Sequence, residues 1–477
     1  MCITLARGNI MNLLDIKVKN LGKLKDGTVK VRPLTVLTGE NGTGKSFFTK
    51  TLYSVFNIVN KNLLYIEATN NIRMSSLGID FFDKSLTRKS KEDKKNIQLL
   101  KLTLNELQSL LMDMKDYSIG AYIQTRSTTT DTQIKNFNRF IEYLTKLEKK
   151  QKIKSVSYPS NILRKSLSSL ILNLTEGKKR YVELLDDALK KELQENFQIA
   201  NISELVSFDE EKTSLSADYG LNISFDAKNI INFNLDSFFI DDISKLSRVV
   251  FFESPAYWSV RDALNKSKEV EEKNDLTGVP KYFYDLDKAL NTKSTNPPLE
   301  IISKLVTELK AEIGGEFIFE NGRLSFVDDS NRSIDKNLIS FGMTNLGMIQ
   351  TLLKNNVISK GSFVFFDEPE TNLHPTWQVL LTKTLIKLAE SGVNVVMATH
   401  SLDMIKALEV HTKEKDGDFI AINHFTKEGG LFEFDSSNIT ENLIESREKL
   451  SSPYTDLYTE DAKNGRFNQL LQNNSAC

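Results

Sequence analysis

Residues 34 to 46 read Leu-Thr-Val-Leu-Thr-Gly-Glu-Asn-Gly-Thr-Gly-Lys-Ser, a short apolar run that leads directly into glycines. The second part of this stretch fits the pattern Gly-x-x-x-x-Gly-Lys-Ser/Thr, and the apolar spacing from Ser46 to about Asn57 predicts that a helix follows. Glycines let backbone N–H groups converge on phosphate oxygens, and the N-terminus of a helix adds positive potential. A buried strand, a glycine loop and a helix in this order therefore predict an α/β fold that binds a nucleoside triphosphate.

Two side chains of this loop have expected chemical roles. Lys45 is expected to neutralise the outer phosphates and to act in catalysis, and Ser46 to offer its hydroxyl to Mg²⁺. An ordinary glycine turn before a helix is the plainer alternative. The expected cofactors are ATP and Mg²⁺. The residues expected to contact the nucleotide here are Gly39, Asn41, Gly42, Thr43, Gly44, Lys45, Ser46 and Phe47.

A second apolar run, Ser362 to Phe366, ends in the acidic segment Asp367-Glu368-Pro369-Glu370. Ligands of α/β folds collect at the carboxyl ends of the central strands, so Asp367 is expected to hold the metal. Glu368 is then placed to orient and deprotonate an attacking water. An acidic pair after a strand is often only a loop cap, but the phosphate loop favours the catalytic interpretation.

Composition excludes several classes of protein. The 477 residues are 40% hydrophobic, and 62 basic against 63 acidic side chains give a net charge of −1, so no global field attracts nucleic acid or membrane. The two cysteines, Cys2 and Cys477, exclude a disulfide framework. No run approaches the ~20 apolar residues of a membrane span. We expect a soluble, cytoplasmic protein with no membrane partner, and translation that starts at Met1 or, equally, at Met11.

The region between about 60 and 200 predicts a mainly helical insertion, because glycine and proline are sparse and leucines recur at spacings of three and four. Residues 84 to 154 hold 16 Lys and Arg against 8 Asp and Glu, a charge of roughly +8. This excess fits a solvated helical face, and it also fits a surface for nucleic acid or a partner. Heptads are not sustained, so a long coiled-coil arm is not expected.

Later patterns predict how the chain returns to the α/β fold. Strands are expected within 214–235 and at Val249–Phe252, the latter stopped by Pro255, and a helix from Asn296-Pro-Pro298 to Gly314. A hairpin is expected around Asn321-Gly322. The expected domains are an N-terminal part of the head at 1–60, the helical insertion at 61–205, returning strands at 206–300, the C-terminal part of the head at 301–436 and a tail at 437–477.

The segment Phe365-Phe-Asp-Glu-Pro-Glu-Thr-Asn-Leu-His-Pro-Thr-Trp-Gln378, followed by Ala398-Thr-His-Ser401, resembles the ABC ATPases of the RecF, SMC and OLD group. Stand-alone ATPases of prokaryotic antiphage systems, of the Septu and PARIS types, are the nearest resemblance. It covers residues 12–60 and about 300–425. In such ATPases a histidine after a strand lies near the γ-phosphate, which implies a catalytic role for His400.

The resemblance also implies a head-to-head homodimer, or a higher even oligomer, in which each ATP lies between one subunit's phosphate loop and the other's signature segment. Here that segment is Ile339-Ser-Phe-Gly-Met343, similar to Leu-Ser-Gly-Gly-Gln, ahead of a helix expected to begin near Asn345 or Leu346. Ser340 and Gly342 would face the γ-phosphate in trans. Phe341 replaces the first glycine, which implies a slow or partner-gated ATPase. Asn372 is expected to contact the opposite subunit.

The functional hypothesis is an ATP-driven dimeric switch that controls a partner effector, expected to be a nuclease, in antiphage defence. The 77 residues after His400 are too few for a fused Toprim nuclease such as that of the OLD proteins. The alternative is a DNA-binding ATPase of repair or recombination that resembles RecF and SMC proteins, with DNA on the basic insertion. A transport subunit is disfavoured, because about 320 residues separate Lys45 from Asp367.

Overall fold

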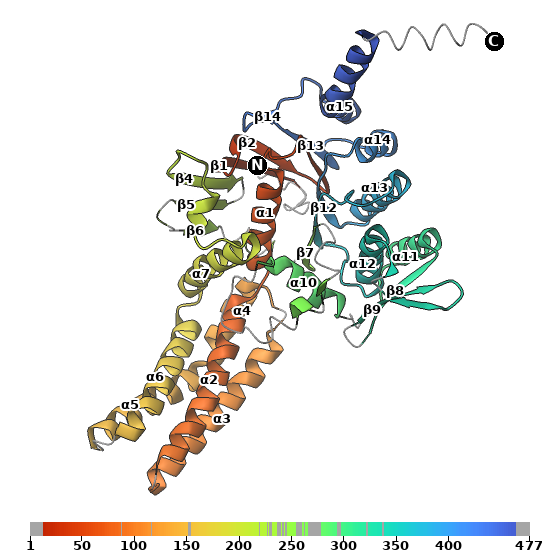
Figure 1. The fold of residues 1–477 in the computed structure, drawn as a ribbon. Helices are drawn as coiled ribbons and strands as arrows, with labels where there is room; N and C mark the ends of the chain where they lie inside the picture. Colours follow the sequence, from red (N-terminus) through yellow and green to blue (C-terminus); the bar gives the residue numbers. More distant parts are fainter. Residues whose placement is uncertain are drawn as a thin grey trace, which may run out of the picture. The chain divides into compact units, whose positions relative to one another are not determined.

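The computed structural model describes residues 13–463, except 87, 116, 151–153, 219, 227, 229–230, 236–239, 241–242, 244–245, 254–259, 262, 266–277, 293–296, 321–322 and 336–337. Several residues named above lie outside the described residues. They are the candidate start residues Met1 and Met11, the cysteines Cys2 and Cys477, Pro255, Asn296 and the Asn321-Gly322 turn. The chain divides into two compact units (Figure 1). The first comprises 1–57, 190–232 and 246–477, and the second 58–189 and 233–245.

The first unit is built on a six-stranded sheet in the order β14-β13-β3-β12-β11-β7. Strands β13, β3, β12, β11 and β7 run parallel, and β14 pairs antiparallel with β13 at one edge. The bounds are β3 Leu34–Thr38, β7 Val249–Phe252, β11 Phe363–Asp367, β12 Asn394–Ala398, β13 Ile420–Phe425 and β14 Leu431–Phe432.

Burial on both faces explains why the parallel strands are continuous apolar runs. Every residue of β3, β7, β11 and β12 is buried, as expected where helices cover both faces of a parallel sheet. Helices of this unit include α1 Lys45–Val59, α10 Lys281–Leu290, α11 Glu300–Ile313, α12 Phe341–Lys354, α13 Pro375–Glu390, α14 Leu402–His411 and α15 Ile439–Lys463. The apolar faces of α10 to α15 and one face of the sheet share a hydrophobic core. Helix α1 packs on the other residues of β11, where the Tyr53 and Phe56 rings contact Phe365 and Phe363.

Two antiparallel sheets complete the first unit. One has the order β2-β1-β4-β5-β6, so that the N-terminal hairpin pairs with strands about 200 residues later, and the other has the order β10-β9-β8. Their bounds are β1 Leu14–Leu21, β2 Leu24–Val31, β4 Lys212–Ala217, β5 Leu221–Asp226, β6 Ile231–Leu235, β8 Gly315–Glu320, β9 Arg323–Asp328 and β10 Ser333–Asp335. A short 3₁₀ helix, η2 Ile202–Leu205, precedes β4.

The second unit is helical. The boundaries of its main segment, 57/58 and 189/190, fall inside α1 and α7, and residues 233–245 also belong to this unit. Helix α2 packs on α3 and α6, and α5 packs on α3 and α6, which closes a bundle. The bounds are α2 Leu63–Ser85, α3 Lys91–Asp113, α4 Ile119–Thr129, α5 Asp131–Lys150, α6 Lys154–Thr175 and α7 Gly177–Phe197.

The expected fold class, an α/β nucleotide-binding head with a large, mainly helical insertion, is confirmed. The expected start of the helix after the signature segment was wrong. Helix α12 begins at Phe341, not near Asn345 or Leu346, because the Ser340 hydroxyl accepts the Met343 N–H at 3.3 Å and so caps the helix at that point. Among the described helices, none is both long and apolar enough to cross a membrane.

Candidate functional site

The phosphate loop joins β3 to α1 through three glycines with positive φ, namely Gly39 at 131°, Gly42 at 76° and Gly44 at 103°. A side chain at Gly39 would bring its Cβ within 2.3 Å of the Phe425 carbonyl oxygen. Only glycine therefore allows β13 to approach the loop here. The motif's glycines are required by backbone geometry as well as by room for phosphate.

The Lys45 side chain is buried and folds back over the loop. Its Nζ donates to the carbonyl oxygens of Gly39 and Glu40, both at 2.8 Å. Burial lowers the pKa of Lys45, while the nearby carboxylates, first Glu368 and then Asp367, favour the charged form. The ammonium group therefore already lies at the loop, where it can exchange the backbone carbonyls for phosphate oxygens.

The other loop residues differ in what they can offer. Asn41 and Gly42 are exposed, and the Thr43 hydroxyl donates to the Glu40 carbonyl at 2.9 Å. The Phe47 ring packs on Phe197, with ring centroids 5.4 Å apart. Because that ring is occupied by packing, Phe47 can contribute to nucleotide binding only through its backbone.

The carboxyl ends of three neighbouring strands meet beside the loop. In the parallel register Asp367 of β11 is level with Ala398 of β12, and Ala398 is level with Leu37 of β3. This alignment brings the Ser46 Oγ to 3.0 Å from Asp367 Oδ1. Burial raises the pKa of Asp367 to about 6, although Lys50 and the Ser46 hydroxyl act in the opposite direction.

Glu368 follows in an unusual backbone conformation, with φ at 50°. A non-glycine residue with positive φ costs free energy and is common at functional sites. The Glu368 N–H donates to the Ala398 carbonyl at 2.9 Å, which fixes the turn, while its side chain is 39% exposed. The carboxylate is therefore accessible to a water molecule.

His400 lies between two carboxylates. Its Nδ1 is 3.6 Å from Glu368 Oε1 and 3.5 Å from Glu370 Oε1. The structure thus brings together Lys45, Ser46, Asp367, Glu368 and His400, the residues for which the sequence predicts chemistry in one subunit.

Glu370 is a site residue to which the sequence analysis gave no role. One oxygen of its buried carboxylate, Oε1, accepts hydrogen bonds from the backbone N–H of His400 at 2.9 Å and from the Thr399 hydroxyl at 2.7 Å. Glu370 therefore fixes the loop that carries His400. The available signal was its place in the acidic segment after β11.

Glu253 was also missed. It directly follows β7, and the Phe252–Phe366 register places it beside Asp367. Its carboxylate forms an ion pair with Lys50 at 2.7 Å and accepts the Tyr282 hydroxyl. A signal did exist, because an acid directly follows the apolar run Val249–Phe252, as an acid follows the run Ser362–Phe366.

The signature segment and Asn372 form a second group. Ser340 and Phe341 are exposed at the N-terminus of α12, whereas Gly342 is buried against the loop after β11. A Cβ on Gly342 would lie 2.8 Å from the Asn372 carbonyl oxygen and 2.9 Å from the Leu373 side chain. Asn372 itself is exposed and has φ at 62°. The two expected trans elements are thus packed on each other within one chain.

The Ser46 and Asp367 oxygens fit a hard divalent cation. Both are oxygen donors of the kind Mg²⁺ prefers, and the desolvated Asp367 carboxylate gains a counter-charge when a cation binds. No cluster of three or more His, Cys, Asp and Glu side chains suited to a metal occurs in the part of the chain that the structure describes.

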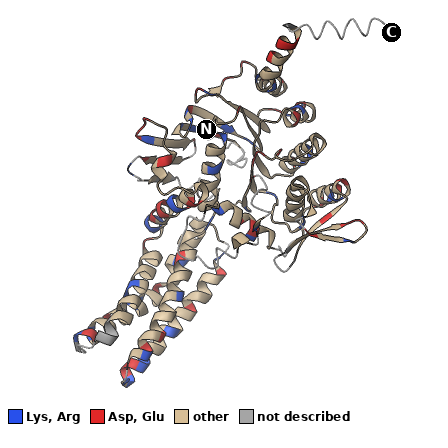
Figure 2. Cartoon of the chain, in the orientation of Figure 1, with Lys and Arg blue, Asp and Glu red and all other residues tan. Residues whose placement is uncertain are grey.

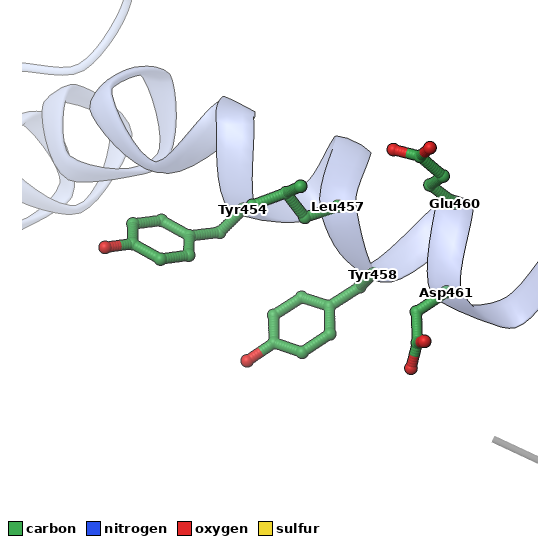
Figure 3. A pocket seen from close by; sticks show the side chains of 5 residues that line it. All are labelled: Tyr454, Leu457, Tyr458, Glu460 and Asp461. Atoms are coloured by element: carbon green, nitrogen blue, oxygen red, sulfur yellow. The ribbon is translucent and has the colours of Figure 1, made fainter. Parts of the chain in front are cut away.

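A pocket outside the phosphate site lies on the last described helix, α15 (Figure 3). Its lining comes from one helix face, on which Tyr454, Leu457 and Tyr458 are 56%, 60% and 70% exposed. The acidic side chains of Glu460 and Asp461 border them. The N-terminal half of α15 is anchored, since Leu443 is buried and Arg447 forms an ion pair with Glu409 at 2.8 Å.

A glycine loop between a buried strand and a helix, with a strand-end Asp-Glu pair and a histidine at the adjoining strand end, defines a P-loop ATPase head of the ABC type. The comparison with protein families agrees. Residues 11–405 match the family described as AAA ATPase domain (AAA_15), and the chain belongs to this family.

Two curated proteins show similarity to this chain. The Endonuclease GajA of Bacillus cereus (strain HuB5-5) is 22% identical over 411 residues, which cover 80% of this chain and 54% of that protein. The Old nuclease of Escherichia phage P2 is 34% identical over 101 residues, 19% of this chain and 17% of that protein. The matched part of the chain thus spans about half of the length of GajA and 17% of the length of the Old nuclease.

Solved structures with similarity include two SMC heads. The SMC head domain from Thermotoga maritima is 10% identical, with a TM-score of 0.37. The match covers 89% of this chain and 100% of the Thermotoga maritima chain. The Smc head domain with an extended coiled coil from Pyrococcus furiosus, bound to the C-terminal domain of ScpA, is 10% identical with a TM-score of 0.39. It covers 91% of this chain and 99% of that chain.

Proposed function

We propose that the chain binds and hydrolyses ATP with Mg²⁺ and works as a cytoplasmic dimeric switch. One observation carries the proposal. The residues for phosphate, metal and water converge at adjoining strand ends, with Ser46 Oγ 3.0 Å from Asp367 and His400 Nδ1 3.6 Å from Glu368. Ser46 and Asp367 would hold Mg²⁺, which would supply positive charge against the phosphates when bound.

The residues of the chain divide the work of hydrolysis. Lys45 binds the outer phosphates once it leaves the Gly39 and Glu40 carbonyls. Glu368 takes a proton from the attacking water, and the exposure of its carboxylate leaves room for that water. His400 contacts the γ-phosphate, in an orientation that Glu370 maintains.

The second ligand surface comes, in this proposal, from another copy. Ser340 presents a hydroxyl and the N-terminus of a 14-residue helix, α12, to solvent, which is a favourable place for phosphate charge. Asn372 is exposed next to it. An ATP between the phosphate loop of one subunit and Ser340 and Gly342 of the other would close the dimer. Phe341 at the helix start makes the closed state harder to reach, so turnover is slow or gated by a partner.

The proposed output is control of a separate effector, a nuclease, in antiphage defence. One curated relative is named an endonuclease and another a nuclease, and the chain spans 54% and 17% of their lengths. The described residues hold no three-residue cluster suited to the metals of a nuclease centre. The exposed face of Tyr454, Leu457 and Tyr458 on α15 is a suitable contact for such an effector.

The test uses two variants of the purified chain, Glu368→Gln and Lys45→Ala, with molar mass measured by light scattering. Glu368→Gln should bind ATP without turnover and accumulate as a dimer with ATP and Mg²⁺, but not with ADP. Lys45→Ala should stay unassembled under all conditions. Normal turnover in Glu368→Gln, or Mg²⁺-dependent DNA cleavage that survives Lys45→Ala, would contradict the proposal.

A second candidate function is a DNA-binding ATPase of repair or recombination. The basic excess of residues 84 to 154 favours it. The two functions differ in the effect of DNA on ATP turnover and in the role of a nuclease. In the repair function DNA itself stimulates ATP turnover by the purified chain, whereas in the switch function a nuclease encoded beside the gene changes activity with the nucleotide state.

A further inference from the structure

One end of the helical bundle gathers exposed cations from segments far apart in the sequence. Some come from the end of α2 and the start of α3, and others from the last turns of α5. Figure 2 shows Lys and Arg along these helix ends. The exposed cations are Lys84, Arg88, Lys91, Lys94, Lys95, Lys146 and Lys149, which we call the tip cluster.

Contacts inside the bundle bring the two segments together. The Tyr143 hydroxyl of α5 donates to Asp93 of α3 at 2.5 Å, and the Tyr143 ring lies 6.4 Å from the Phe82 ring of α2. Lys146 follows Tyr143 by one helical turn, and Lys94 adjoins Asp93. The two sets of cations therefore belong to one end of the bundle.

Most acidic side chains at this end are already engaged. Asp83 forms an ion pair with Lys89 at 2.6 Å, and Glu148 with Arg164 at 2.7 Å. Asp93 is buried and also accepts the Ser90 N–H at 2.7 Å. The tip cluster, in contrast, forms no ion pair with any described residue, so its cations are available to a ligand.

Two exposed aromatic rings lie at the same end. Phe81 of α2 is 61% exposed and Tyr158 of α6 is 74% exposed. Helices α2 and α6 are antiparallel neighbours, because Asn71 contacts Ser169 at 3.0 Å and Ser75, one turn later, contacts Ser166 at 2.8 Å. The last turn of α2 therefore meets the first turns of α6.

Cations beside exposed aromatic rings suit single-stranded nucleic acid, because phosphates pair with the cations while unpaired bases stack on the rings. Exposed Glu92 and Glu142 lie among the cations. A flat anionic membrane would meet these carboxylates together with the lysines, whereas a narrow strand can follow the cations alone. We propose that the tip cluster, with Phe81 and Tyr158, binds nucleic acid and prefers single strands. The inference does not depend on the ATP switch.

The experiment measures binding of the full-length chain to fluorescent 30-nucleotide dT and to a 30-base-pair duplex by anisotropy, across a salt series. We expect tighter binding to the single strand and a steep loss of affinity with salt. Lys91→Gln, Lys94→Gln and Lys95→Gln together should weaken binding at least tenfold and reduce the salt slope by about 2, since each lost phosphate contact removes roughly 0.7.

The matched control neutralises three exposed cations of the same unit away from the tip, Lys115, Lys135 and Lys178. It makes the same change in charge and should alter affinity less than twofold. Equal losses in both triple variants would overturn the proposal, as would tighter binding to anionic lipid vesicles than to either DNA.

Two further variants separate the parts of the proposal. Phe81→Ala with Tyr158→Ala should weaken binding of the single strand and leave the duplex unchanged, and an unchanged single-strand affinity would refute the stacking role. Lys45→Ala, which tests the ATP switch, should keep the affinity for DNA. Loss of DNA binding in that variant would contradict an independent tip site. Circular dichroism establishes that each variant is folded.

Discussion

The hydroxyl of Ser46 lies 3.0 Å from the carboxylate of Asp367, although 321 residues separate them in the sequence. The contact exists because α1 begins beside the carboxyl end of β11, and parallel strands of one sheet bring their ends to a common edge. It joins the phosphate loop directly to the acidic segment. The metal ligands proposed here are therefore held in place by the fold.

Asp367→Asn should stabilise the chain in the absence of Mg²⁺ and nucleotide. Burial raises the pKa of Asp367 to about 6, above the ordinary value of 3.8. The folded chain therefore holds this proton more tightly than the unfolded chain. The free energy of unfolding falls as pH rises from about 4 to 6, and the full cost, about 3 kcal/mol, applies at neutral pH.

Thermal unfolding in chelator checks this. The gain in melting temperature of Asp367→Asn should be largest at pH 7.5 and should shrink below pH 5, while Mg²⁺ with ATP should stabilise the unmodified chain only. Asp26→Asn, at an exposed aspartate of β2, is the control and should change little. A gain that does not vary with pH would disprove the proposed cause.

Glu370 should act as a positioning residue for His400. In Glu370→Ala the His400 N–H and the Thr399 hydroxyl lose their common acceptor, Oε1. Leaving buried donors unpaired costs about 1–3 kcal/mol each. We expect kcat to fall tenfold or more, with KM for ATP nearly unchanged. Glu370→Gln keeps an oxygen acceptor and should recover most of the activity, which a purely electrostatic role would not allow.

How far the sequence predicts the site depends on whether its signal is local. The phosphate loop, Asp367-Glu368 and His400 each follow an apolar strand, and the parallel sheet then places their ends together. The wrong start of α12 has a local cause too. Serine is a preferred N-cap residue, so Ser340 itself signals a helix that begins at Phe341, whereas the resemblance implies a loop and a later helix.

Other features depend on pairing between distant segments, which periodicity does not encode. Strand β1 pairs with β4, so Ile16 lies opposite Ala217, and nothing in either strand specifies the partner. Glu253 acquires a place in the site only because β7 lies next to β11. The acids engaged near the tip cluster also depend on packing. Asp93 meets Tyr143 only because α3 packs on α5, and Glu148 meets Arg164 only because α5 packs on α6.

Phe341 should slow turnover by its bulk. It is 45% exposed at the first position of α12, where the resemblance of the signature segment implies a glycine. Phe341→Gly should raise the turnover rate per dimer several-fold, measured as phosphate release at saturating ATP. Because glycine also weakens a helix by roughly 0.5–1 kcal/mol, Phe341→Ala serves as the control that removes the ring alone. If both variants turn over ATP more slowly, the ring has a supporting role instead.

Gly342→Ala should abolish ATP-driven assembly and leave ATP binding by one subunit intact. The added methyl would lie 2.8 Å from the Asn372 carbonyl oxygen and 2.9 Å from Leu373, so the start of α12 must move away from that loop. Gly417→Ala is the matched control, because a Cβ there meets nothing within 4 Å. Light scattering with ATP, in the Glu368→Gln background, should give dimers for Gly417→Ala and monomers for Gly342→Ala. If both variants form dimers, the contact between Gly342 and the Asn372 loop does not shape the surface that contacts the ATP of the other subunit.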